Sequence, residues 1–233
     1  MKILCISDDK DVLVYSPNIA QRYKDVDMIL SAGDLPLKYY EYIVSSLNKP
    51  FYFVFGNHHT EELTRFKKTD VLGPSGAMAD FGKPVFNQGV GGDFIDGKVV
   101  RDKKSGLIIA GLGGSMRYND GRHQFSETEM FFRILSMIPR LIYNKLRHGR
   151  FVDILLTHAP PRNYGDKEDL CHRGFSSFLL FIRYFKPRYL LHGHIHLIDM
   201  NAERVKEYRG CRIINVYSSY VLQEDERNGQ GQL

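Results

Sequence analysis

The sequence predicts an α/β fold, and three observations support that prediction. Short runs rich in β-branched and aromatic residues alternate with helical stretches along the first half of the 233-residue chain. Strand-like runs outnumber helical ones in the second half, which indicates that this part is rich in β-structure. Hydrophobic residues make up 43% and charged residues 25%, which is typical of a globular protein with a substantial core.

Eight runs are predicted to be buried strands, because each is apolar and short and most end at glycine or a polar residue. They cover residues 2–7, 26–33, 51–56, 98–102, 107–113, 152–158, 189–193 and 211–218.

Four helices are predicted between these strands. Ser16 followed by Pro17 is typical of a helix start, and Ser126 with Glu129 forms a capping-box pattern. Pro139 is expected to kink or divide the long helix that follows Ser126. The predicted helices cover residues 17–24, 36–47, the stretch from 126 that contains Pro139, and about 174–184.

The organisation predicts a single domain over residues 1–233 with a frayed polar tail from about residue 223. No apolar run approaches the ~18 residues of a membrane helix, and the N-terminus lacks a signal-peptide pattern. Cys5, Cys171 and Cys211 are widely spaced and form no CxxC pair, which argues against disulfides and a cysteine zinc site. We therefore expect a cytoplasmic protein without a membrane partner.

The net charge is +5 and the isoelectric point is near 9.0. A mildly basic chain suits anionic substrates. Nucleic acid is possible as a partner but is not indicated, since no basic run is interleaved with aromatic residues. The sequence leaves the oligomeric state open.

Polar side chains follow five of the predicted strands, at the point where each strand ends. In open α/β sheets this edge is where sites form. A lone histidine at a strand end is more often structural, but the joint pattern favours a common site. The residues are Asp8, Asp34, Asn57 with His58, His158, and His194 with His196.

These side chains offer carboxylate, amide and imidazole ligands and no thiolate. Such a set favours Mn²⁺, Fe²⁺ or Fe³⁺, Zn²⁺ or Ni²⁺ over a Ca²⁺ cage, and one or two metal ions are expected. Two metals about 3.5–4 Å apart are the usual arrangement for displacement at phosphorus. Gly33, Gly56 and Gly193 are expected to let the backbone turn sharply beside these residues.

The motifs GDLP, GNHH, THAPP and GHIH, with Asp8 before them, resemble the calcineurin-like metallophosphoesterase superfamily from Asp8 to His196. The resemblance implies a four-layer αββα sandwich, with two mixed β-sheets flanked by helices. It also implies hydrolysis of a phosphodiester or phosphomonoester by a metal-bound hydroxide that attacks phosphorus.

The resemblance also implies a role for each matching residue. Asp34 would bridge two metals, and Asp8 and His196 would serve one of them. His58 would be the catalytic residue that protonates the leaving oxygen or stabilises charge on the phosphate. The remaining metal would be bound by Asn57, His158 and His194.

Two positions depart from the family pattern. Lys10 stands where the pattern has a histidine ligand, and a protonated lysine has no lone pair for a metal. Its site could be weakened, with water, Asp9 or Asp11 filling the gap. Alternatively, the ammonium could neutralise Asp8 or hold phosphate, or the side chain could point to solvent.

His59 stands where the pattern has an acidic residue that would orient the catalytic histidine. His59 itself, Glu61, Glu62 or Asp9 could take that role.

The loop over residues 111–123 follows a predicted strand and is a candidate substrate loop. Arg117 could bind a phosphate through two hydrogen bonds, and Arg122 and His123 are weaker candidates. A solvated surface loop is an equally valid interpretation. A dinucleotide fingerprint fails because Met116 occupies the position that requires glycine or alanine.

The sequence therefore predicts a metal-dependent phosphoesterase acting on a phosphate-ester substrate. Two alternatives stay open: a member of the fold that has lost catalytic power and binds a protein, and a nuclease.

Overall fold

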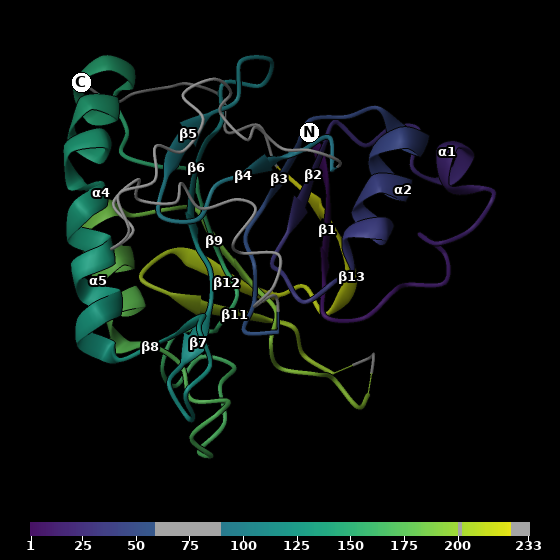
Figure 1. The fold of residues 1–233 in the computed structure, drawn as a ribbon. Coiled ribbons are helices and arrows are strands. Elements are labelled where there is room, and N and C mark those ends of the chain that lie inside the picture. Colours follow the sequence, from purple (N-terminus) through teal and green to yellow (C-terminus); the bar gives the residue numbers. More distant parts are fainter. Residues whose placement is uncertain (59–89, 200–201, 225–233) are drawn as a thin grey trace, which may run out of the picture.

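The computed structural model describes residues 1–58, 90–199 and 202–224. It is a four-layer sandwich in which two β-sheets face each other and helices cover their outer sides, as Figure 1 shows. Helices α1 and α2 lie outside one sheet, and α4 and α5 lie outside the other. The αββα arrangement implied by the resemblance is confirmed.

The first sheet has the order β13-β1-β2-β3-β4. Strands β1 to β4 run parallel to their neighbours, and β13 pairs antiparallel with β1. The strands are β1 Lys2–Ser7, β2 Met28–Ser31, β3 Phe51–Phe53, β4 Asp93–Phe94 and β13 Ser218–Gln223.

The second sheet has the order β11-β12-β10-β9-β6-β5, with four central parallel strands and antiparallel edges. Its strands are β5 Val99–Arg101, β6 Ile108–Leu112, β9 Ile154–Thr157, β10 Tyr189–His192, β11 Val205–Tyr208 and β12 Cys211–Asn215. A separate pair joins β7 Ser115–Met116 to β8 Gln124–Phe125.

The described helices are α1 Ile19–Arg22, α2 Leu37–Leu47, α4 Glu127–His148 and α5 Ser176–Phe185. The capping box of Ser126 and Glu129 is present at the start of α4. Pro139 was expected to kink or divide this helix; α4 is continuous through Pro139, so the helix is not divided. Pro139 leaves the carbonyl of Leu135 without its helical donor, and Leu135 is exposed, so water can satisfy that carbonyl.

Side chains alternate along the strands between two apolar layers, as expected for strands covered on both faces. On β1, Leu4 and Ile6 pack toward α1 and α2, whereas Ile3 and Cys5 pack between the two sheets. A third cluster fills the space between the second sheet and helices α4 and α5. The central strands are therefore buried on both sides, and polar groups emerge at their ends.

The structure also bears on two other expectations, a frayed C-terminal tail and the lack of a membrane helix. Glu224 accepts a hydrogen bond from Arg188 and its amide donates to the Met1 carbonyl, so Gln223 and Glu224 are part of the packed structure. The rest of the predicted tail lies outside the described residues. Within residues 1–58, 90–199 and 202–224, none of the helices has the length and apolar character needed to cross a membrane.

Candidate metal centre

The parallel strands of the two sheets bring the predicted polar residues to one edge of the sandwich. Asp8 and His158 come directly after β1 and β9, and Asp34, Asn57 and His194 follow β2, β3 and β10 within a few residues. Backbone hydrogen bonds join these segments: Asp8 N donates to Gly33 O, and Gly193 N donates to His158 O. The two sheets thus contribute to a single site.

The imidazole of His158 lies at the middle of this site. Its Nε2 atom is 3.1 Å from Asn57 Oδ1, 3.1 Å from His194 Nδ1 and 3.2 Å from Asp34 Oδ2. The His158 side chain is fully buried, and Asn57 and His194 are nearly so. Four potential ligand atoms from four different loops therefore converge.

Hydrogen bonds to the other polar atom of His158, His194 and Asn57 determine whether the atoms that converge are donors or acceptors. His158 Nδ1 is 2.8 Å from Ala32 O, and His194 Nε2 is 2.7 Å from Cys171 O, so we assign the ring protons to those nitrogens. Asn57 Nδ2 donates to the Tyr118 hydroxyl at 3.2 Å, which turns Oδ1 inward. In this assignment His158 Nε2, His194 Nδ1, Asn57 Oδ1 and Asp34 Oδ2 all present lone pairs to one another.

Such a set of acceptors fits a divalent metal ion. Acceptor atoms that face each other without a donor repel one another, and a cation between them removes the repulsion. Metal–ligand bonds of about 2.0–2.2 Å place neighbouring ligand atoms about 2.8–3.4 Å apart. The three distances from His158 Nε2 lie within that range.

The electrostatics of the two histidines differ sharply. Burial lowers the pKa of His158, but the charge and hydrogen bond of Asp34 outweigh burial and raise this pKa to about 9. Burial and the neighbouring His158 lower the pKa of His194 to about 3. A proton on His158 and a metal ion are therefore alternative ways to satisfy the same acceptors.

The backbone around the centre is held in sparsely populated conformations. Asp8, Asp34 and His194 have φ of 62°, 55° and 67°. Left-handed backbone in residues other than glycine costs about 1–3 kcal/mol each and concentrates at functional sites. Three strand-end loops thus carry strain at the residues that would bind metal.

Gly56 and Gly193 are required because a side chain at either position would collide with a carboxylate of the centre, not because the backbone turns there. A Cβ atom on Gly56 would lie 2.2 Å from Asp34 Oδ1, and one on Gly193 would lie 2.3 Å from Asp8 Oδ2. Of the three, Gly33 alone has a positive φ, of 104°. The expectation of sharp turns thus holds for Gly33, whereas Gly56 and Gly193 permit a close approach of the carboxylates.

Asp8 and His196 lie beside the centre in a looser arrangement. Both oxygens of Asp8 accept the His194 backbone N–H, at 3.0 and 2.9 Å. His196 Nε2 is 3.9 Å from Asp8 Oδ1, and the exposed His196 ring packs against Tyr217 with 4.9 Å between centroids. Burial raises the pKa of Asp8. These two residues could reach a second metal, but they are less tightly arranged than the four acceptors.

Lys10 is exposed and directs its ammonium toward a neighbouring aromatic ring. Its Nζ lies 5.6 Å from the centroid of the Tyr15 ring, a cation–π contact. Of the three outcomes expected for Lys10, this geometry agrees best with a side chain that points to solvent.

His58 is exposed at the mouth of the centre, and its backbone N–H donates to Asp34 Oδ1 at 3.2 Å. The candidates His59, Glu61 and Glu62 lie outside the described residues.

Comparison with known proteins identifies the family. A model of calcineurin-like phosphoesterases matches residues 1–197. The chain belongs to this family. No curated protein matches it. One crystal structure aligns at 12% identity and a TM-score of 0.61, covering 95% of this chain and 94% of the other.

A second crystal structure, of the protein TT1561 of Thermus thermophilus, aligns at 13% identity and a TM-score of 0.56, covering 93% of this chain and 88% of the other. These identities establish a shared fold alone. Family membership supports a metal-dependent hydrolase in general, and the cluster of Asp34, His158 and His194 supplies candidate ligands for it.

The candidate substrate residues of the 111–123 loop have other partners within the chain. Arg117 Nη2 lies 2.8 Å from both carboxylate oxygens of Glu129 at the start of α4. Arg122 is exposed. His123 is fully buried, and its ring lies 2.9 Å from Gly56 O and 3.3 Å from Asp96 Oδ2. His123 therefore supports the turn before Asn57 and is not accessible to substrate.

Sequence reasoning missed Asp96, which anchors this support. Its carboxylate accepts from Gly113 N at 2.7 Å and pairs with the guanidinium of Arg133. Burial raises the pKa of Asp96, but Arg133 and His123 outweigh burial and hold it well below its usual range. Asp96 follows a two-residue strand, so no pattern in the sequence indicated it.

Sequence reasoning also missed Tyr118, whose hydroxyl touches Asn57. Gln124 Oε1 accepts from the backbone N–H groups of Tyr118 and Asn119 at 3.0 and 3.2 Å. The buried Gln124 therefore fixes the loop that carries Tyr118. The only signal in the sequence was that this loop follows a predicted strand.

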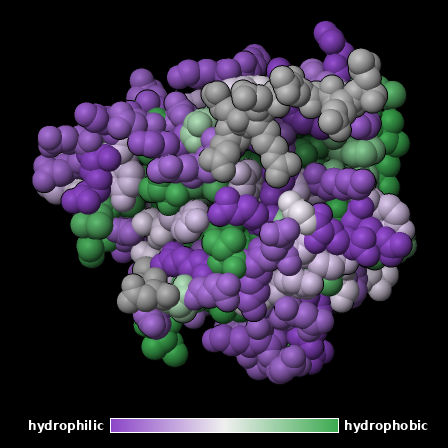
Figure 2. Space-filling model, turned by 180° about the vertical axis from the view of Figure 1, so that it is seen from behind, coloured by the Kyte–Doolittle hydropathy of each residue, from purple (hydrophilic) through white to green (hydrophobic). Residues whose placement is uncertain are grey.

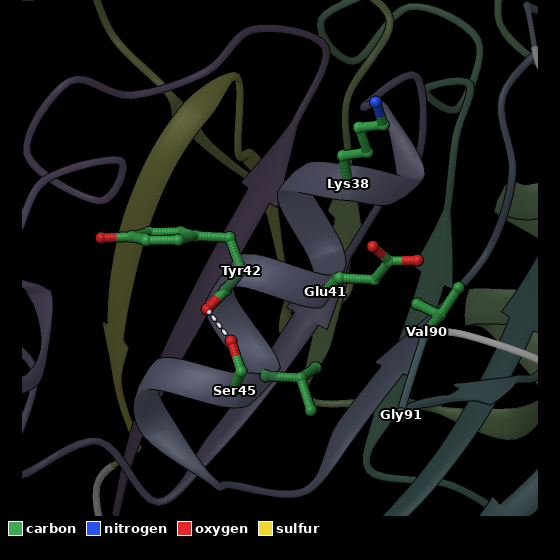
Figure 3. A pocket seen from close by; sticks show the side chains of 7 residues that line it. Lys38, Glu41, Tyr42, Ser45, Val90 and Gly91 are labelled. Atoms are coloured by element: carbon green, nitrogen blue, oxygen red, sulfur yellow. Dashed lines mark hydrogen bonds between the residues drawn. The ribbon is translucent and has the colours of Figure 1, made fainter.

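An open pocket lies away from the candidate metal centre. It is a depression of about 640 Å³ beside α2. In Figure 3, Glu41 extends from the helix toward Val90. None of the candidate metal ligands lines it. On the face seen in Figure 2, hydrophobic residues form small groups among hydrophilic ones. The chemistry of the strand ends, rather than the size of a cavity, therefore locates the site.

Proposed function

We propose that this chain is a phosphoric ester hydrolase that acts with one tightly held divalent metal and a second, weaker one. The observation that carries the proposal is the convergence of Asn57 Oδ1, His194 Nδ1 and Asp34 Oδ2 within 3.1–3.2 Å of His158 Nε2. Family membership supports the same class of reaction. The substrate is a phosphodiester or phosphomonoester.

Each group has a role in this proposal. A bound metal would supply the Lewis acid that polarises phosphoryl oxygen and lowers the pKa of water. Asp34, Asn57, His158 and His194 would hold it, while Asp8 and His196 would serve the weaker site. His58 is exposed beside Asp34 and would donate a proton to the leaving oxygen. Its exposure leaves the imidazole accessible to a substrate from solvent.

The proposal is tested with purified protein and two chromogenic substrates, bis-p-nitrophenyl phosphate and p-nitrophenyl phosphate. Mn²⁺, Ni²⁺ and Zn²⁺ are added one at a time after removal of metal with a chelator. We expect metal-dependent release of nitrophenol from at least one substrate. Failure on both substrates with all three metals would refute the proposal.

Lys10→His is expected to strengthen the weaker metal site. Histidine can donate a lone pair that lysine lacks, and the exposed position offers room for a new ring. We expect isothermal titration with Mn²⁺ to show a second equivalent binding at least about tenfold more tightly than in the unmodified chain. Lys10→Gln is the matched control. Unchanged stoichiometry and affinity would mean that residue 10 does not reach the ligand position.

Tyr118→Phe is expected to reduce turnover. Asn57 Nδ2 donates to the Tyr118 oxygen, so the phenol proton can be donated to a phosphate at the centre. A hydrogen bond to a charged group contributes about 1.5–3 kcal/mol, so kcat/KM should fall about 10- to 100-fold. Tyr143→Phe, on the outer face of α4, is the control. Wild-type kinetics for Tyr118→Phe would remove Tyr118 from the site.

A second candidate function, protein binding, is favoured by the outer face of α4. Phe132, Tyr143 and Leu146 are 62%, 50% and 83% exposed, although large apolar side chains are usually covered. This alternative predicts a protein that fails the two-substrate test and forms a stable complex through α4. Loss of that complex in Leu146→Glu would support it.

A further inference from the structure

We propose that Asp169, Cys171 and His172 form an additional site for a zinc-class divalent cation, separate from the four-acceptor centre. Three potential ligand atoms meet there. Cys171 Sγ is 2.9 Å from Asp169 Oδ1, His172 Nδ1 is 2.7 Å from the same oxygen, and Cys171 Sγ is 3.3 Å from His172 Nδ1. The three groups lie within four consecutive residues of the segment between β9 and α5.

The donor set determines the class of metal. A thiolate, an imidazole and a carboxylate suit Zn²⁺ or Co²⁺, whereas Mg²⁺ and Ca²⁺ prefer oxygen ligands alone. Bonds of about 2.0–2.3 Å around a tetrahedral ion hold such atoms roughly 3.3–3.5 Å apart, so a small outward shift would admit the metal. Binding would displace the proton that the Cys171 thiol now donates to Asp169.

Salt bridges and a backbone hydrogen bond hold this segment in shape. Arg162 pairs with Asp166 at 2.7 Å and with Glu168 at 2.9 Å. Asp166 Oδ2 also accepts from Gly174 N at 3.0 Å, which closes the base of the loop. These contacts also take up the charge of Arg162, which reduces its repulsion of a nearby cation. The three ligand groups are therefore pre-positioned on the surface.

The additional site is connected to the four-acceptor centre through His194. The carbonyl of Cys171 accepts from His194 Nε2 at 2.7 Å, and the His172 ring lies 5.3 Å from the His194 ring between centroids. A cation on Cys171 and His172 would fix the carbonyl that orients a proposed metal ligand. The absence of a CxxC pattern excludes a site made of cysteines alone, but not a mixed site of this kind.

Cobalt substitution tests this inference on the full-length, reduced protein. A thiolate bound to Co²⁺ gives an intense charge-transfer band in the near ultraviolet, and the four-acceptor centre contains no thiolate. Cys5 and Cys211 are each 0% exposed, so Cys171 is the accessible thiol of the three in the chain. We expect the band to appear on titration with Co²⁺ and to be absent from Cys171→Ser.

The variants separate this site from the proposed catalytic centre. Asp169→Asn and His172→Gln should each weaken Co²⁺ binding, measured by the intensity of the charge-transfer band, by at least about tenfold. Asp34→Asn should keep the band, and so should the control Asp25→Asn, which changes an exposed carboxylate outside this segment. Zn²⁺ should also slow the reaction of Cys171 with a thiol-specific reagent in wild type and in Asp34→Asn.

No band at saturating Co²⁺, or a band that persists in Cys171→Ser, would overturn the additional site. Loss of the band in Asp34→Asn would also overturn it as a separate site. A positive band with no hydrolysis of either chromogenic substrate would leave the additional site standing and refute the proposed function alone.

Discussion

Asp34→Asn is expected to lower metal-dependent hydrolysis by about 10³-fold or more. The substitution keeps the size of the side chain but removes the negative charge that lies 3.2 Å from His158 Nε2. Metal-based stabilisation of charge at phosphorus contributes several kcal/mol, and about 4 kcal/mol corresponds to about 10³ in rate. Steady-state kinetics at saturating Mn²⁺ measures the effect, and isothermal titration measures the accompanying loss of metal affinity.

Asp25→Asn is the matched control, because Asp25 is an exposed carboxylate that pairs with Lys2 at 3.8 Å. It should keep wild-type kinetics and metal binding. A melting temperature near that of metal-free wild type would show that Asp34→Asn is folded. Wild-type turnover in Asp34→Asn would contradict the role proposed for Asp34.

Asp96→Ala is expected to lower the free energy of unfolding by about 3–5 kcal/mol, because it leaves the partly buried guanidinium of Arg133 without its carboxylate. It also removes the oxygen facing His123, which supports Gly56 next to Asn57. Urea unfolding monitored by circular dichroism measures the loss. Because Asp96 supports this turn, residual activity should fall together with stability.

The pH dependence of the Asp96 effect follows from the direction of its pKa. The pKa in the folded protein is depressed, so the stabilisation is fully present above the unfolded value of about 3.9 and is lost as pH falls below it. The difference between wild type and Asp96→Ala should therefore be constant near neutrality and shrink in acid. Asp93→Ala, an exposed carboxylate on β4, should change stability by less than about 0.5 kcal/mol. Equal losses in the two variants would contradict this account.

The site residues that follow strand ends could be predicted from the sequence. The strand predicted at residues 2–7 matches β1, and parallel strands must bring the groups after β1, β2, β3, β9 and β10 to one edge. The structure brings together Asp34, Asn57, His158 and His194 as that reasoning expected. The pattern was informative because each group closely follows an apolar strand.

Features that depend on tertiary contacts could not be predicted in this way. Asp96 and Tyr118 lie in loops without periodicity, and their partners are Arg133 and Asn57, which are distant in sequence. Pro139 was expected to kink or divide a helix, but α4 is continuous, and the exposure of Leu135 makes the lost hydrogen bond tolerable. Arg117 was a candidate for phosphate binding, and nothing in the sequence indicated that its guanidinium pairs with Glu129. In each case the deciding contact depends on how the chain packs in three dimensions.

Anomalous X-ray diffraction from crystals grown with Mn²⁺ tests the central claim most directly. Mn²⁺ is suited to carboxylate and imidazole ligands and poorly suited to thiolate, so it distinguishes the centre from the cysteine-containing cluster. We predict one strong peak about 2.0–2.3 Å from His158 Nε2, His194 Nδ1, Asn57 Oδ1 and an oxygen of Asp34, with a weaker peak near Asp8 and His196. Saturating Mn²⁺ without a peak among the four acceptors would contradict the claim.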